Sequence, residues 1–134
     1  MQITLIRSTL RIHLMMTMRI FLIVFLTVLM PVVGTADSVF VTKAQRFIDL
    51  VSGKTLRRPL IWLQVSSNGT ISGAGAFQKV TGKWTWQEGY FCRSLRWGGS
   101  DLPYNCQQVI IDGDSLRFTS DRGTGDSATF KLTP

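Results

Sequence analysis

The chain has 134 residues, with 15 Lys and Arg against 8 Asp and Glu, and a net charge of +7 at pH 7. It contains two cysteines and a single histidine, His13. His13 lies in an N-terminal stretch that we expect to be removed. The remainder therefore lacks the side chain needed for Ser-His-Asp or Cys-His catalysis and for His-ligated zinc. The composition disfavours the common hydrolases, and we expect no metal site and no cofactor.

Residues 1–36 have the order of a secretory signal peptide. Three arginines precede an apolar run over residues 20–33, and small residues follow at Gly34 and Ala36. That order predicts cleavage after Ala36. The segment from Met18 onward is complete as a signal, so Met18 is the favoured start of translation, with Met15 and Met16 as the alternatives. An uncleaved anchor is the less favoured alternative, because a membrane-spanning helix needs about 20 apolar residues.

The expected mature chain, residues 37–134, is long enough for a single domain. It keeps twelve basic and eight acidic residues, a net charge of +4. This charge suits solubility and an anionic partner, but it lacks the dense basic clusters of nucleic-acid-binding proteins. We expect a periplasmic or secreted protein whose partner is a small molecule or an envelope protein. Contact with a membrane is expected only through the signal peptide before cleavage.

One short helix is expected near the start of this domain. Thr42 and Gln45 have the spacing of a capping box, and Gly53 can end the helix. Apolar residues at helical spacing lie between them: Ala44, Phe47, Ile48 and Val51. Such a helix would plug one end of the fold or pack against its outside.

From residue 61 onward, apolar and polar residues alternate as in strands that bury one face. The expected strands are residues 61–65, 70–77, 80–86, 90–97, 105–111, 116–120 and 128–132. Their connections are too short for parallel crossovers, so the sheet should be antiparallel. The pattern predicts a mainly β protein, a small antiparallel β-barrel of about seven or eight strands, lipocalin-like or inhibitor-like, with one short N-terminal helix.

Cys92 and Cys106 lie in neighbouring expected strands and are symmetric about Gly99. A hairpin that turns at residues 98–100 places them opposite each other, within the range that a disulfide can span. In an exported domain two cysteines usually form one disulfide. A Cys92–Cys106 disulfide that staples this hairpin is therefore predicted.

Residues around the same hairpin are candidates for ligand binding. A barrel mouth that holds a small molecule needs aromatic walls and a few directed polar groups. Arg93 shares a strand face with Leu95 and Trp97. A surface arginine is the favoured interpretation of this pattern, and a buried binding-site arginine is the alternative. The candidate residues are Tyr90, Arg93, Trp97, Asn105 and Gln107.

The densest polar cluster, residues 121–127, contains Asp121, Arg122 and Asp126. A calcium or anion site is one hypothesis, but the ligand spacing of an EF-hand is missing. The favoured interpretation is a loop between strands, in which Asp caps backbone N–H groups and Arg122 pairs with a carboxylate.

Gly82-Lys83-Trp84 resembles the Gly-x-Trp signature of lipocalin-type barrels, in which the tryptophan closes the base of the barrel. The motif is short and lies in the middle of the chain. An ordinary core or rim aromatic of a β protein is therefore the favoured interpretation of Trp84.

Several longer segments together resemble a family of small exported alphaproteobacterial proteins of unknown function. They are residues 47–56, 82–93, 105–107 and 116–128. Members of that family often carry the automatic label dihydrodipicolinate reductase. Such an enzyme needs a strand, a Gly-x-Gly-x-x-Gly loop and a helix for its nicotinamide cofactor. Gly73-Ala74-Gly75 instead lies within a strand pattern, so this sequence does not support the label.

The leading hypothesis is an exported, disulfide-stapled barrel that binds a small molecule, a glycan or a protein partner. The alternatives are an enzyme that uses carboxylates alone, such as Asp121 with Asp126, and an envelope structural protein. An apolar cavity inside the barrel would favour a pocket. A barrel filled by its own side chains would favour a protein-binding surface.

Overall fold

The computed structural model describes Gly34 and residues 37–134. The predicted signal peptide, its start at Met18 and its cleavage site after Ala36 lie outside the described residues. Within the described part, none of the helices has the length and apolar character required to cross a membrane.

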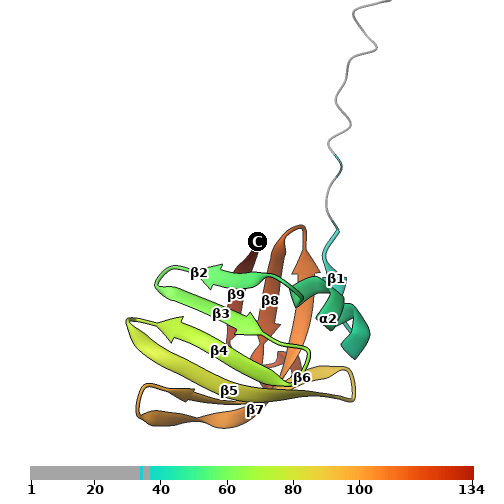
Figure 1. Ribbon diagram of the computed structural model, residues 1–134. Helices are drawn as coiled ribbons and strands as arrows, with labels where there is room; N and C mark the ends of the chain where they lie inside the picture. Colours follow the sequence, from blue (N-terminus) through green and yellow to red (C-terminus); the bar gives the residue numbers. More distant parts are fainter. Residues whose placement is uncertain (1–33, 35–36) are drawn as a thin grey trace, which may run out of the picture. The chain divides into compact units, whose positions relative to one another are not determined.

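The nine strands of the described chain form one antiparallel sheet, and eight of them close into an up-and-down barrel (Figure 1). They are β2 (Thr55–Arg58), β3 (Ile61–Val65), β4 (Thr70–Gly75), β5 (Gln78–Gln87), β6 (Tyr90–Trp97), β7 (Ser100–Asp112), β8 (Ser115–Thr119) and β9 (Ser127–Thr133). Each of these strands pairs with the next along the chain, and β9 closes the barrel by pairing with β2. The ninth strand, β1 (Val39–Phe40), pairs with the end of β7. The predicted small antiparallel β-barrel is therefore confirmed.

All seven expected strands are present, but the sequence patterns missed β1 and β2. In β2, two buried residues, Thr55 and Leu56, precede two exposed arginines, so the polar alternation of a strand is absent. The segment is a strand because its backbone pairs with β3 on one side and with β9 on the other. Gly73-Ala74-Gly75 lies within β4, and another strand follows it rather than the helix of a dinucleotide-binding motif.

Helix α2 (Ala44–Val51) occupies the segment in which a helix was expected, but the predicted capping box is wrong. Lys43 is the N-cap residue, and no side chain caps the helix there. The Gln45 amide instead donates to the Asp49 carboxylate, 2.8 Å away and one turn later. At the other end, Gly53 follows the C-cap with φ of 69°, as a terminating glycine does.

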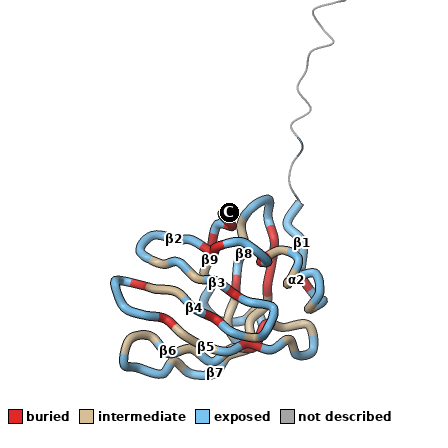
Figure 2. Tube along the Cα trace, viewed as in Figure 1, coloured by how far each residue is buried: buried red, intermediate tan, exposed pale blue. Residues whose placement is uncertain are grey.

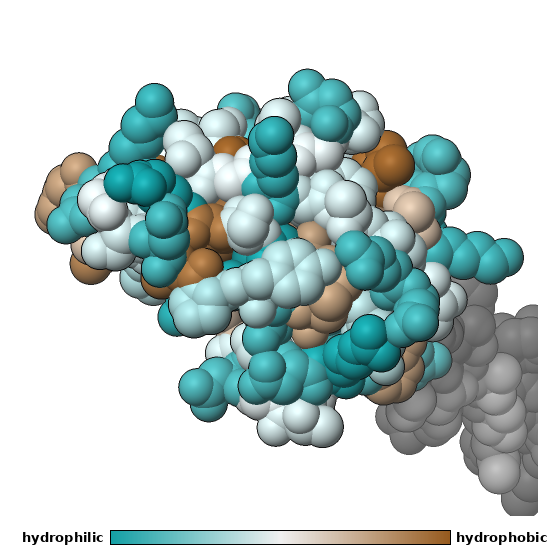
Figure 3. All heavy atoms as spheres, turned by 90° about the horizontal axis from the view of Figure 1, so that it is seen from below, coloured by the Kyte–Doolittle hydropathy of each residue, from teal (hydrophilic) through white to brown (hydrophobic). Residues whose placement is uncertain are grey.

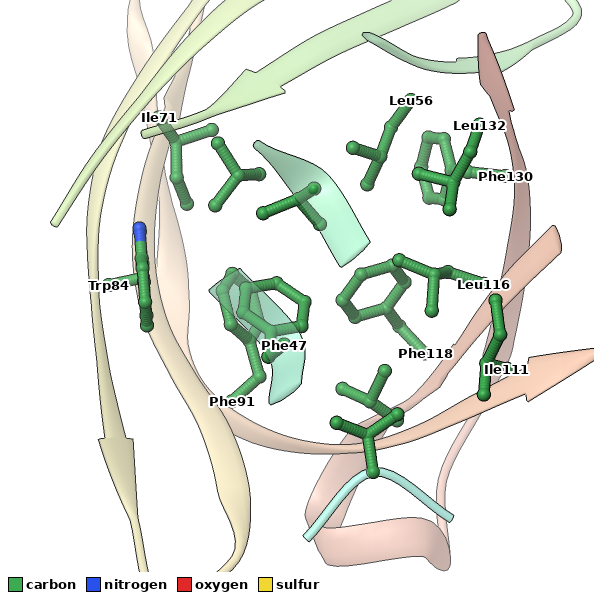
Figure 4. Packing of buried hydrophobic residues seen from close by; sticks show 14 residues of the cluster. Phe47, Leu56, Ile71, Trp84, Phe91, Ile111, Leu116, Phe118, Phe130 and Leu132 are labelled. Carbon is green, nitrogen blue, oxygen red and sulfur yellow. The ribbon is translucent and has the colours of Figure 1, made fainter. Parts of the chain in front are cut away.

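Helix α2 plugs one end of the barrel with Phe47, whose side chain is fully buried. Its ring lies 5.0 Å from that of Phe91 and 5.3 Å from that of Trp84, measured between centroids. Figure 4 shows these rings together with Phe118 in the barrel interior. Trp84 is therefore a core aromatic, as favoured above, and its indole donates to the Ser66 carbonyl at 2.9 Å. Buried residues recur at intervals along the strands (Figure 2), as expected where one face of each strand points into the barrel.

The predicted disulfide is confirmed: Cys92 and Cys106 are bonded, and their Cα atoms lie 3.9 Å apart. The predicted turn is wrong by one residue. Ser100 already pairs with Trp97, so residues 98 and 99 alone form the turn. The register then shifts between Arg93 and Leu95, which restores the pairing of the cysteines.

Candidate ligand-binding site

The barrel interior opens into a cavity of about 200 Å³ at the end away from α2. The topology explains this position. Helix α2 leads into the first residue of β2, so it lies at the end of the barrel where β2 begins. Arg58 is the last residue of β2, at the other end of that strand, and it lines the cavity. Most of the walls are apolar, with contributions from Ile61, Leu63, Val80, Leu95, Trp97 and Leu102.

The size of this cavity limits what it can hold. An apolar protein cavity of about 150 Å³ accepts one benzene ring, whereas drug-sized ligands occupy pockets of about 300 Å³ or more. The mouth therefore fits one ring or a short chain. A larger molecule would place only its apolar end inside.

Arg93 lies on the inner face of β6 and is half-buried in the wall of this cavity. One guanidinium nitrogen, Nη1, donates to the Pro103 carbonyl at 2.8 Å. Burial removes water from the charged group and lowers the pKa of Arg93 from its ordinary value. Among the described residues, the ion pairs involve other cations, so no carboxylate balances this charge.

Two further polar side chains line the cavity. Gln107, a sequence-predicted candidate, donates from its amide to the Ser120 hydroxyl at 3.3 Å. Arg58, which was not among the candidates, lies with its guanidinium carbon 5.7 Å from the centre of the Phe130 ring. Arg58 could not be selected from the sequence, because β2, the strand that directs it toward the mouth, lacks a strand pattern.

Trp97 forms part of the wall, and its position depends on Gly75 in β4, two strands along the sheet from β6. Its indole N–H donates to the Gly75 carbonyl at 3.0 Å. A Cβ atom at Gly75 would overlap the indole ring. The absence of a side chain at position 75 therefore lets Trp97 lie flat across this side of the mouth.

The other two candidates, Tyr90 and Asn105, do not line the cavity. Asn105 donates to the Asp121 carboxylate at 2.7 Å and accepts from the Asp121 backbone N–H at 3.0 Å. The Tyr90 ring lies beneath Arg122, with 5.2 Å between the guanidinium carbon and the ring centre. Both residues therefore hold the turn that follows β8.

That turn, α3 (Ser120–Gly123), has left-handed backbone angles at Asp121 and Arg122. Arg122 forms an ion pair with Glu88 at 2.9 Å, and Asp121 is engaged by Asn105. These contacts match the favoured interpretation of a structural loop between strands. Neither Asp121 nor Asp126 lines the cavity, so the structure does not place them on its wall with Arg93, Trp97 and Gln107.

No three His, Cys, Asp or Glu side chains of the described chain lie close enough together to hold a metal ion. No family model, curated protein or solved structure matches this chain. The resemblance to the alphaproteobacterial family remains a prediction. The structure brings three of the five sequence-predicted ligand residues, Arg93, Trp97 and Gln107, to one apolar cavity.

Proposed function

We propose that this protein is an exported binding protein that holds a small amphiphilic anion in the mouth of its barrel. One observation carries the proposal. Arg93 lies half-buried on the wall of an apolar cavity, and no carboxylate of the described chain pairs with it.

The apolar part of the ligand would displace water from the leucines and Trp97 that form the walls. Burial of apolar surface contributes about 25 cal/mol per Å², so even a single ring gives useful affinity. The anionic group would face Arg93, whose planar guanidinium can donate two parallel hydrogen bonds to a carboxylate. The Gln107 amide and the Arg58 charge lie on the same cavity and would strengthen the preference for anions.

Export is part of the proposal and rests on two features. The first 36 residues have the composition of a signal peptide. The Cys92–Cys106 disulfide is typical of proteins that fold in an oxidising compartment.

Matched pairs of probes test the ligand class. Hexanoate is compared with hexanol and benzoate with benzyl alcohol, because each pair differs mainly in charge. We expect calorimetric titration to give at least tenfold tighter binding of each anion than of its neutral partner.

Arg93→Met should strongly weaken this preference, leaving only what Arg58 and Gln107 supply, while it keeps the binding of the neutral probes. The control is Arg117→Met, because Arg117 lies on an exposed position of β8 and should leave all affinities unchanged. The proposal is wrong if the anions do not bind saturably, or if Arg93→Met binds them as tightly as the wild type.

A further inference from the structure

The turn between β2 and β3 places a large apolar residue where glycine or asparagine is usual. Pro59 and Leu60 form this two-residue turn between the paired residues Arg58 and Ile61. Leu60 has φ of 63°, and the residue is 71% exposed. A turn with proline first and a positive φ second is normally completed by glycine or asparagine.

The neighbouring turn between β4 and β5 has the same property. Ala76 and Phe77 connect the paired residues Gly75 and Gln78, with φ of 45° and 66°. Two successive positive φ angles are typical of a type I′ turn, in which Asn-Gly is the preferred sequence. Phe77 is 97% exposed, so its ring gains almost no burial within the barrel.

The two turns are joined, because the Ala76 backbone N–H donates to the Leu60 carbonyl at 2.9 Å. Bulky side chains in the left-handed region carry a conformational cost. Burial does not offset that cost at Leu60 or Phe77, because both side chains point into solvent. A contact outside the barrel would explain why these residues occupy the two tips.

A groove of about 310 Å³ lies beside the two tips. Its walls include Arg57, Leu60, Trp62 and Phe77. Figure 3 views the barrel from below and shows apolar side chains exposed among hydrophilic ones at the left end, where the turns at the mouth lie in Figure 1. The groove is large enough to receive a side chain from another molecule.

The surroundings of this groove are basic. The register places Arg57 beside Trp62, Trp62 beside Ala74, and Ala74 beside Lys79, in one row across β2 to β5. Residues 50–87, which include these four strands, contain five Lys and Arg and no Asp or Glu. The complementary partner is therefore acidic.

We infer that this tip surface, made of Arg57, Leu60, Trp62, Phe77 and Lys79, docks a segment of a partner protein that presents an apolar side chain flanked by carboxylates. Aromatic residues and arginine dominate the energetics of protein interfaces, and this surface supplies both kinds. An anionic bilayer would match the charge but offers no single side chain to fill the groove. The inference concerns the outer surface and does not depend on the ligand proposed for the barrel cavity.

A peptide panel tests this inference. Each peptide carries a central leucine, phenylalanine or tryptophan between flanks of glutamate, and its controls replace the flanks by glutamine or the centre by serine. Binding is followed through the indole N–H resonance of Trp62 in a nitrogen–proton correlation spectrum, assigned with Trp62→Phe. We expect a saturable shift with the acidic apolar peptides, weakened by salt, and at least tenfold weaker binding of both controls.

The double variant Ala76→Asn, Phe77→Gly separates docking from folding, because it installs the preferred turn sequence. We expect a higher melting temperature together with at least tenfold weaker peptide binding. Tyr104→Ser, at another exposed aromatic residue, should leave peptide binding unchanged. The inference is overturned if no peptide of the panel shifts Trp62, if the double variant melts at a lower temperature, or if only phosphatidylglycerol vesicles bind.

Discussion

Cys92 and Cys106 lie directly opposite each other because a β-bulge corrects the register set by their turn. Trp97 pairs with Ser100 at the turn, and a regular ladder would bring Cys92 opposite Asn105. Between Arg93 and Leu95 the register shifts by one, so that residues 103 and 104 together face Ser94. Pro103 has no backbone N–H to donate to the ladder, and it is tolerated here because a bulge leaves one residue unpaired. The bulge also supplies the Pro103 carbonyl that accepts from Arg93.

The disulfide should contribute a large part of the stability of this small domain. It closes a loop with a sequence separation of 14. For a loop of this size the chain-entropy model gives about 3 kcal/mol. Replacement of both cysteines by alanine should lower the free energy of unfolding by about that amount in urea titrations. Reduced wild-type protein should unfold like the variant; equal stability of oxidised and reduced protein would contradict the prediction.

Deletion of Pro103 should keep the disulfide and remove the bulge. The shortened strand would form a regular ladder from the turn, and Cys106 would still face Cys92. We expect no free thiol in the unfolded, unreduced variant. Arg93 would lose its carbonyl acceptor, so the anion preference of the barrel mouth should weaken. Two reactive thiols per chain would show that the bulge is required for the bridge.

Phe47 should be the most sensitive position of the core. Its buried ring joins α2 to aromatic residues on three strands, among them Trp84, Phe91 and Phe118. Phe47→Ala removes these contacts and leaves a cavity, at a cost of about 3–5 kcal/mol. Phe40→Ala, at an exposed site, should change the free energy of unfolding by less than about 0.5 kcal/mol. Similar losses for both variants would argue against α2 as the plug.

Gly75 and Gly99 form a matched pair for testing the wall of the mouth. Alanine at Gly75 would force the Trp97 indole to move, whereas a Cβ atom at Gly99 meets nothing within 4 Å. We expect Gly75→Ala to destabilise the barrel by about 1–3 kcal/mol and Gly99→Ala to be nearly neutral. Thermal unfolding followed by calorimetry would compare them, and equal effects would rule out the close approach of Trp97.

A surface ion pair should make the stability of the fold depend on pH in the acidic range. Lys131 lies 3.1 Å from the Asp114 carboxylate and, with Ser115, holds the pKa of Asp114 below its ordinary value of 3.8. The folded state binds a proton at Asp114 less readily than the unfolded state does. The ion pair therefore stabilises the fold at pH values above the ordinary pKa. This stabilisation is lost as the pH falls through the lower pKa of the folded state.

Asp114→Asn should therefore melt slightly below the wild type at neutral pH and low salt, with the gap closing in strong acid. Lys131→Met should reproduce this behaviour because it removes the same contact. A gap that stays constant from neutral pH to strong acid would exclude the pair as its source.

The strands could be predicted because apolar and polar residues alternate along a strand that buries one face. Residues 61–65 and 128–132 alternate clearly, and both are strands. By contrast, β2 lacks this alternation, because two buried residues precede two exposed arginines, and its pairing with β9 joins segments far apart in the chain. The capping box failed for a different, local reason: Lys43 rather than Thr42 is the N-cap residue, and the Gln45 amide donates to Asp49.

The candidate site was partly predictable for the same reason. Arg93 and Trp97 share a strand face with apolar residues, which made them candidates, but the same pattern suited a surface arginine better; the structure places both residues on the cavity wall. The side chain of Asn105 is instead engaged by Asp121, which lies 16 residues away in the sequence. Tyr90 likewise pairs with Arg122. Alternation of apolar and polar residues gives no information on such side-chain contacts between distant positions.

The pairing of β2 with β9 also determines when this protein can finish folding. Every other contact between neighbouring barrel strands joins segments that are consecutive in the chain, so these hairpins can form early. The pairing of β2 with β9 cannot form until residues 127–133 are available to meet residues 55–57. Until then both strands are unpaired edges that can recruit other chains. A chain threaded through a membrane from its N-terminus would therefore stay open, and prone to aggregation, until its final strand had crossed.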